Sequence, residues 1–249
     1  MTEDRYPDSS YWIILLLGSY DPKTEQVLYY LRENISECYM GLDNVVLVLL
    51  LNNVEIYVVD HVDNKNEAKK FTLIVERYRE NKTTLYKLEE LSIGDVIDIH
   101  ISEQDSIDNQ IINHLRKEYN VIDFVKLGIL EKLEFIGSTS TSIFFIRHRE
   151  LTRGGEYVEL VYLLDKLNPE KIFFLKREGF DLSTMALEIL DKQGVILRTY
   201  RRESQLTEEI MRLFKNIQKK FKWFDSGKSI CNAIRRKMSC HKGGRRIIL

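Results

Sequence analysis

The sequence predicts an α/β protein with a parallel sheet that is covered by helices on both faces. Two observations lead to this prediction. Short, continuous apolar runs recur along the chain, as strands buried on both faces require, and helical patterns separate them. The chain has 249 residues, of which 44% are hydrophobic and 30% are charged, so it can bury a core of this size.

The N-terminal part begins this pattern. "WIILLL" (12–17) is a continuous apolar strand, "GSYDP" is a turn, and "KTEQVLYYLRENISECY" carries apolar residues along one helical face. The segment 44–62 is expected to form two strands joined at Asn52-Asn53, and "FTLIVERY" and "DVIDIHI" also look extended. Residues 45–102 are therefore predicted to be a β-rich elaboration. Helices are expected at about 106–119 and at 123–135.

The second half alternates regularly between strands and helices. Apolar runs predict strands at 142–147, 171–176 and 195–200. Helical patterns predict helices at 155–166, 183–192 and 204–221, with Ser183 and Ser204 as N-caps. Right-handed crossovers would make these strands parallel to the first one, and Gly18 and Gly155 would then lie at the same edge of the sheet.

Charge separates the body of the chain from its C-terminal end. From Met211 onward, 12 lysines and arginines face one acid, Asp225, although the whole chain has a net charge of −1. We expect one domain over 1–221 and a basic tail over 222–249. The tail could contact nucleic-acid phosphates or a protein partner. It could equally be a solvated segment that balances an acidic body, or make an amphipathic membrane contact.

Several classes of protein are excluded by what the sequence lacks. The polar N-terminus has no signal-peptide pattern, and the apolar runs are too short for a transmembrane segment, so a cytoplasmic protein is expected. Three scattered cysteines suit neither a disulfide framework nor a structural zinc site. The motifs of P-loop NTPases, zinc proteases and dithiol redox proteins are missing. No metal and no cofactor are expected.

Two loops are candidates for a ligand site, because ligands of open parallel sheets bind at the carboxyl ends of the strands. One is Gly18-Ser19-Tyr20-Asp21 and the other is the stretch from Arg147 to Glu159. Glycine allows a close approach of the backbone to a ligand, and a helix N-terminus favours anions such as phosphate. The simpler interpretation of the first loop is a tight turn in which Asp21 caps the helix.

Together, "IILLLGSY" and "GGEYVELVYLL" resemble segments of the nucleoside 2-deoxyribosyltransferase-like proteins, which are Rossmann-like relatives of TIR domains. Gly155 falls on the glycine of the family's "G-T-x-x-E-x-G-x-A" segment, and Glu159 falls on its glutamate. The resemblance covers roughly 12–40 and 125–221. It implies a Rossmann-like fold and an enzyme that cleaves or transfers at the N-glycosidic bond of NAD or a nucleoside phosphate.

The resemblance also implies roles for individual residues. Glu159 would attack C1′ of the nucleoside or stabilise positive charge there, and Tyr20 would orient it. The ligand backbone would be cradled by the small or polar residues of the two loops, namely Gly18, Ser19, Asp21, Gly154 and Gly155. A ligand phosphate would be neutralised by Arg147, His148 and Arg153.

Two departures from the family pattern keep other functions open. Basic residues (147–149) stand where the family has an aspartate, and Val161 replaces its second glycine. A non-catalytic nucleotide-sensing or scaffold protein is therefore an alternative, as is a nucleic-acid-associated accessory protein of a defence system. A helical wheel places Tyr157, Leu160, Val161 and Leu164 on one face, which would leave Glu159 nearly opposite, as an ordinary surface residue.

Overall fold

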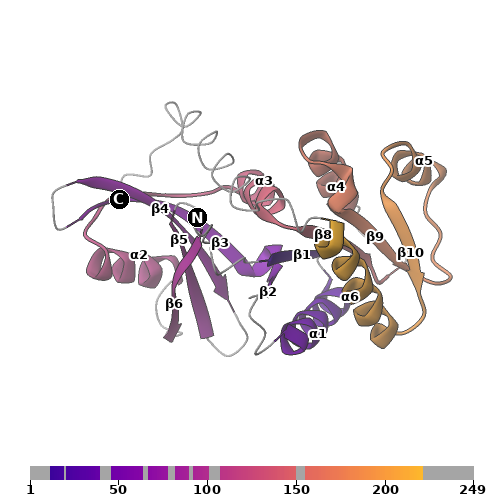
Figure 1. Ribbon diagram of the computed structural model, residues 1–249, viewed down its shortest axis with the longest axis horizontal. Coiled ribbons are helices and arrows are strands. Elements are labelled where there is room, and N and C mark those ends of the chain that lie inside the picture. The colour runs from indigo at the N-terminus through magenta and orange to yellow at the C-terminus, as the bar shows by residue number, and fades with distance from the viewer. Residues whose placement is uncertain are drawn as a thin grey trace, which may run out of the picture. The chain divides into compact units, whose positions relative to one another are not determined.

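The computed structural model describes most of the chain, in eight stretches: 12–19, 21–39, 46–63, 67–77, 82–89, 92–100, 107–149 and 155–220. Contacts between residues divide the described chain into two compact units (Figure 1). The first unit takes its residues from both ends of the described chain, up to Leu51 and from Leu133 onward. The second unit contains the described residues of Asn52–Lys132.

The first unit is built on a five-stranded parallel sheet with the strand order β10-β9-β8-β1-β2. Its strands are β1 (Trp12–Gly18), β2 (Val46–Leu50), β8 (Ser142–Arg147), β9 (Ile172–Arg177) and β10 (Ile196–Tyr200). Apolar side chains fill nearly every position of β1, β2 and β8, and almost all are buried. The predicted parallel arrangement of the strands at the two ends of the chain is confirmed.

Helices cover both faces of this sheet, as expected from the sequence. Their bounds are α1 (Pro22–Tyr39), α3 (Ile129–Thr139), α4 (Gly155–Lys166), α5 (Thr184–Lys192) and α6 (Glu203–Lys220). Helices α1 and α6 pack on one face through a core that includes Leu31, Ile35 and Phe214. Helices α4 and α5 lie on the opposite face (Figure 1). The α/β architecture is therefore the Rossmann-like one that the sequence predicted.

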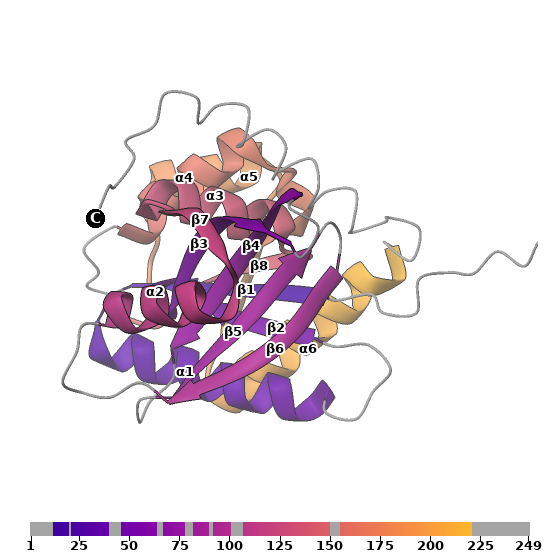
Figure 2. The same ribbon diagram turned by 90° about the vertical axis from the view of Figure 1, so that its left-hand side faces the viewer.

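The second unit is an antiparallel sheet with the strand order β6-β5-β4-β3-β7 (Figure 2). Its strands are β3 (Val54–Val62), β4 (Ala68–Arg77), β5 (Lys82–Glu89), β6 (Ser92–His100) and β7 (Val121–Lys126). Helix α2 (Ile107–Glu118) packs on one face, where Ile111 and Leu115 join a cluster with Tyr57, Phe71 and Leu73. The predicted β-rich elaboration is present.

Two details of the predicted elements need correction. The segment 44–62 does form two strands, but β2 joins the parallel sheet and only β3 belongs to the antiparallel one. The helix expected at 123–135 is replaced by β7 and by α3, which begins at Ile129. Val121, Phe124 and Val125 favour a strand here because β3 offers a partner edge, and Gly128 interrupts the helical pattern.

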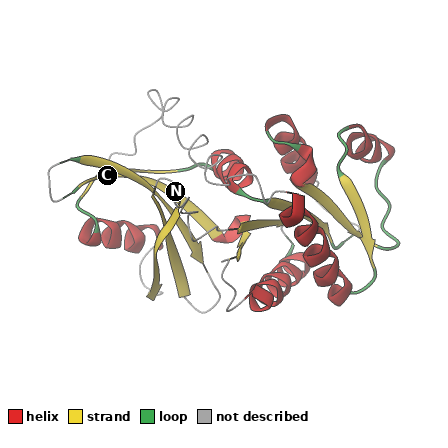
Figure 3. Ribbon diagram, in the orientation of Figure 1, coloured by secondary structure: helices red, strands yellow, loops and turns green. Residues whose placement is uncertain are grey.

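The helix and strand boundaries follow ordinary local signals (Figure 3). Ser183 caps α5, since its hydroxyl accepts a hydrogen bond from the Ala186 amide at 3.2 Å. Ser204, the expected cap of α6, is already inside that helix, which begins at Glu203. Gly194 has a φ of 69° in the turn between α5 and β10, a conformation that glycine adopts without strain. The basic tail 222–249 lies outside the described residues.

Candidate functional site

The carboxyl edge of the parallel sheet contains a topological switch point between β1 and β8. From β1 the chain moves outward to β2, whereas from β8 it moves in the other direction to β9 and β10. Right-handed connections therefore place α1 and α4 on opposite faces of the sheet. Both helices begin at the same edge, one on each side of the sheet. Ligands of open α/β sheets bind in the crevice that such a reversal creates.

Gly18 ends β1 directly beside β8, because it pairs with Ile146 in the parallel register. A Cβ atom at Gly18 would lie 2.9 Å from the Thr24 Cγ2 atom and 3.1 Å from the Ile146 carbonyl oxygen. The glycine therefore serves the close packing of β1, β8 and α1. Gly155 is the first residue of α4 and follows β8, so both glycines lie at the carboxyl edge as predicted.

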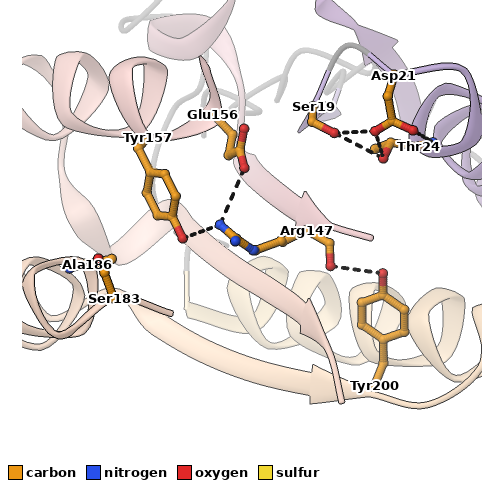
Figure 4. A network of polar contacts seen from close by, with 9 residues as sticks. All are labelled: Ser19, Asp21, Thr24, Arg147, Glu156, Tyr157, Ser183, Ala186 and Tyr200. Carbon is orange, nitrogen blue, oxygen red and sulfur yellow. Dashed lines mark hydrogen bonds and ion pairs between the residues drawn. The ribbon is translucent and has the colours of Figure 1, made fainter. Parts of the chain in front are cut away.

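Asp21 caps α1 and is held by several hydrogen bonds (Figure 4). Its Oδ1 atom accepts from the amides of Lys23 and Thr24, each at 3.1 Å. Its Oδ2 atom accepts from the hydroxyls of Ser19 and Thr24, each at 2.5 Å. Burial alone would raise the pKa of Asp21, but these hydrogen bonds lower it to about 2. Asp21 is thus an ionised N-cap, and it lies 3.6 Å from the Arg149 guanidinium.

Arg147, at the end of β8, is joined to the first turn of α4. Its Nη1 atom donates to the Tyr157 hydroxyl at 2.5 Å and lies 3.6 Å from Glu156 Oε1 (Figure 4). The guanidinium also lies over the Tyr157 ring, 5.3 Å from its centroid, and that ring stacks on Phe174. The Glu156 carboxylate and the Tyr157 ring, both in the first turn of α4, therefore hold the Arg147 guanidinium in place.

Glu156, in the first turn of α4, was not among the site residues expected from the sequence. It is 1% exposed, and neither of its carboxylate oxygens accepts a hydrogen bond from the residues that the structure describes. A buried carboxylate is costly to desolvate, so the Arg147 charge is what compensates it here. The structure thus places a buried ion pair at the switch point.

The buried face of α4 differs from the predicted one. It contains Glu156, Leu160 and Leu163, whereas Val161, expected to be buried, is 50% exposed. The spacing i, i+4, i+7 is the ordinary pattern of a buried helical stripe. This stripe could have been found in the sequence, but it begins with a charged residue and was therefore passed over.

His148 follows Arg147 and turns toward β10. Its Nδ1 atom lies 3.1 Å from the Tyr200 hydroxyl, and that hydroxyl also donates to the Arg147 carbonyl oxygen at 3.4 Å. Burial, with a smaller contribution from the Arg177 charge, lowers the pKa of His148. Burial likewise raises the pKa of Tyr200. His148 is therefore a mostly buried, neutral hydrogen-bonding group at neutral pH.

Glu159 lies one turn beyond Glu156 and is half-buried. Tyr162, three residues further along the same side of α4, donates from its hydroxyl to Glu134 of α3 at 2.9 Å. Residues three apart share a helix face, so Glu159 faces the α3 side of α4. Further along α4, Lys166 pairs with Asp165 at 3.3 Å.

Three of the expected site residues, Tyr20, Arg153 and Gly154, lie outside the described part of the chain, so the expected contact between Tyr20 and Glu159 stays a prediction. The other expected site residues all lie at the carboxyl edge of the sheet or in the first turns of the helices that follow it: Gly18, Ser19, Asp21, Arg147, His148, Gly155 and Glu159.

The carboxyl edge combines two arginines with two carboxylates. No group of three or more histidine, cysteine, aspartate or glutamate side chains that could hold a metal ion occurs among the described residues. Arg147 and Arg149 bring two positive charges to the end of β8, where Glu156 and Asp21 pair with them. Across the described stretches of the chain, no helix is long and apolar enough to cross a membrane.

Comparisons with known proteins give little further guidance. No protein-family model and no curated protein matches the chain. Among solved structures, the chain is similar to one described as "An oligomerised bacterial dynamin pair provides a mechanism for the long range sensing and tethering of membranes". The identity is 10% and the TM-score is 0.29, over 91% of this chain and 37% of that chain. The chain thus spans little more than a third of that protein, and a likeness this distant establishes no family.

Proposed function

We propose that the protein binds a nucleotide-type ligand at the carboxyl edge of the parallel sheet and cleaves or transfers at its N-glycosidic bond. The observation that carries the proposal is the convergence at the β1–β8 switch point. The loop after β1, the arginines after β8 and the carboxylates of α4 all belong to this edge. This combination of an anion-binding rim and nearby carboxylates suits a phosphorylated glycoside.

The ligand phosphate would be bound by Arg149, which is 44% exposed, together with Arg147 at the end of β8. Arginine suits this role because its planar donors match phosphate oxygens in pairs. The Ser19 hydroxyl, which now donates to Asp21, lies at the same edge and could reach a ribose hydroxyl. Binding would therefore use residues that the fold already fixes.

The reaction needs a carboxylate, because positive charge develops on the sugar as the base leaves. Glu159 would form a bond to C1′ while the bond from C1′ to the base nitrogen breaks. The electron pair of that bond leaves with the base; adenine takes up a proton as it leaves, whereas the cationic nicotinamide of NAD becomes neutral without one. Water then attacks C1′ and releases the sugar and the free carboxylate, and in a transfer reaction an acceptor base takes the place of water.

Glu156 has a different role in this proposal. Its buried carboxylate is already paired with Arg147, so it is a positioning residue that holds the arginine in place. Tyr20 remains the expected orienting partner of Glu159. His148, through Tyr200, ties the end of β8 to the end of β10.

Binding without turnover is the second candidate, and one specific observation favours it. Two described acids that pair with the arginines serve the fold, since Asp21 caps α1 and Glu156 compensates Arg147. Within the described part of this edge, Glu159 is then the candidate to act on a sugar. If it does not reach the ligand, the same edge would be a nucleotide sensor.

The test is incubation of the protein with NAD, AMP and deoxyadenosine in separate reactions, with chromatography of the free base. We expect release of base by the wild-type protein and a loss of at least about a hundredfold in Glu159→Gln. Glu188→Gln is the matched control, because Glu188 is an exposed glutamate on α5. It should release base at the wild-type rate.

Calorimetric titration of the same compounds separates the two candidates. Turnover that survives Glu159→Gln contradicts the catalytic assignment. Saturable binding without release of base supports the sensor, and its loss in Arg149→Gln would assign that binding to the carboxyl edge. Failure of all three compounds to bind or react would contradict both candidates.

A further inference from the structure

The two arginines at the end of β8 are held with different firmness. The Arg147 side chain is 10% exposed, and it contacts the buried Glu156 carboxylate and the Tyr157 hydroxyl. The Arg149 side chain is 44% exposed, and its Nη1 atom lies 3.6 Å from the Asp21 Oδ1 atom, which is too far for a hydrogen bond. Exposed ion pairs are weak, whereas a buried charge that loses its partner is costly. Arg149 can therefore change its partner at low cost.

Asp21 does not depend on Arg149 to remain ionised. Its carboxylate accepts hydrogen bonds from the amides of Lys23 and Thr24 and from the hydroxyls of Ser19 and Thr24. Burial raises the pKa of Asp21, and these hydrogen bonds bring it down to about 2. The carboxylate thus keeps its charge and its place as the N-cap of α1 when the arginine leaves.

The Asp21–Arg149 pair joins the ends of two neighbouring strands at the switch point. Asp21 follows β1 and Arg149 follows β8, and these two strands pair in parallel. The Asp21 carboxylate therefore lies beside the guanidinium to which the proposed function assigns the ligand phosphate. Carboxylate and phosphate are both anions, so they compete for the same cation.

We propose that Asp21 is a positioning residue that holds Arg149 in the absence of ligand and exchanges it with the phosphate of the ligand. This inference rests on the proposed function, because it requires a phosphorylated ligand at the carboxyl edge. The planar guanidinium pairs with the carboxylate in one state and with phosphate oxygens in the other. The charge of Asp21 thus lowers the affinity for a phosphorylated ligand and leaves a ligand without phosphate unaffected.

The test is calorimetric titration of the full chain with AMP and with adenosine, which differ only in the phosphate, at pH 8 and constant ionic strength. A phosphate monoester is a dianion at this pH. The main variant is Asp21→Asn, because asparagine caps a helix about as well as aspartate but carries no charge. Glu25→Gln is the matched control, since it removes one negative charge from an exposed side chain in the first turn of α1. Thermal unfolding confirms that each variant folds.

We expect Asp21→Asn to lower the Kd for AMP by about fivefold and to leave the Kd for adenosine unchanged. Glu25→Gln should leave both Kd values within about twofold of wild type. Combined with Arg149→Gln, Asp21→Asn should bind AMP no more tightly than Arg149→Gln alone, because the gain acts through the arginine. A purely structural effect on the loop after β1 would instead change the two Kd values alike.

Three outcomes would overturn the proposal and leave the proposed function standing, provided that Arg149→Gln weakens AMP binding. These outcomes are unchanged or weaker AMP binding by Asp21→Asn, an equal gain for adenosine, and a gain for AMP that persists without Arg149. AMP binding that Arg149→Gln leaves unchanged would overturn both the exchange and the assignment of the phosphate to this edge. Absence of AMP binding by the wild-type protein and by Asp21→Asn would likewise overturn both.

Discussion

The parallel and antiparallel sheets differ in where they hold charged residues. In the parallel sheet, β1 and β2 carry no charge, and the charges of β8 and β9 come at their carboxyl ends; the edge strand β10 differs, with Arg198 in its middle. In the antiparallel sheet, charged residues occur within the strands and pair across them, as in Lys70–Asp60. The difference follows from burial, since strands covered on both faces can place a charge only where they end.

This contrast has a functional consequence. Side chains at the carboxyl edge of the parallel sheet are forced together, so a few residues define its chemistry. Charges spread over the antiparallel sheet are mostly solvated and individually weak. Glu55 is an exception there, because Arg77, Lys126 and Lys132 lie 3.2–3.9 Å from its carboxylate. The following experiments test the contrast, from the largest expected effect to the smallest.

The largest effect is expected from Glu156→Gln. This change leaves the Arg147 charge without its buried partner, so the free energy of unfolding should fall by about 3 kcal/mol. The matched change in the antiparallel sheet, Asp60→Asn, breaks an exposed pair and should cost less than about 1 kcal/mol. Urea unfolding measures both. An equal loss of unfolding free energy in the two variants would contradict the difference between buried and exposed charges in the two sheets.

Lys171→Met should have an intermediate effect. The Lys171 ammonium donates to the carbonyl oxygens of Gly137 and Ser140 at the end of α3, at 2.7 and 3.1 Å, and to that of Ser138 at 3.3 Å. Burial lowers its pKa to about 8, so these donors are still protonated at pH 7.

Removing the ammonium leaves three buried acceptors, and we expect a loss of about 2 kcal/mol in urea unfolding at pH 7. Lys166→Met, at an exposed position of α4, is the control and should lie within about 0.5 kcal/mol of wild type. An unchanged free energy of unfolding in Lys171→Met would mean that water replaces the lysine ammonium at the end of α3.

The smallest effect concerns His148 and pH. Because its pKa is lowered in the folded protein, the unfolded chain binds a proton first as the pH falls below about 6.5. Stability should therefore decline from pH 6.5 down to the lowered pKa, by at most about 1.4 kcal/mol per pH unit. His148→Gln should flatten this part of the profile in urea unfolding at several pH values. An unchanged profile would assign the pH dependence to other groups.

The sequence predicted the parallel sheet well because its strands are nearly uniform apolar runs, which have few other uses in a soluble protein. It predicted the positions of Gly18, Arg147 and Gly155 at one edge because the order of strands and helices fixes that edge. The predicted buried face of α4 was wrong, because Glu156 was assumed to point toward solvent. Glu156 begins the buried stripe that continues with Leu160 and Leu163, and Arg147 compensates its charge.

The boundaries in the middle of the chain were also hard to predict. The apolar runs of β2 and β3 adjoin, and nothing local shows that they join different sheets. The segment of β7 has apolar residues that suit a helix or a strand, and pairing with β3 decides the outcome. The contacts of Glu55 with Arg77, Lys126 and Lys132 were not foreseen, because these residues are far apart in sequence and come from two strands and a helix.

The central claim is that the carboxyl edge of the parallel sheet binds a nucleotide-type ligand. Hydrogen exchange by mass spectrometry, with and without NAD, AMP or deoxyadenosine, tests it most directly. We predict slower exchange in the segments 18–25 and 146–149 and at the start of α4, with each compound that binds. Slower exchange confined to the antiparallel sheet, or no change at the carboxyl edge with any of the three compounds, would contradict the claim.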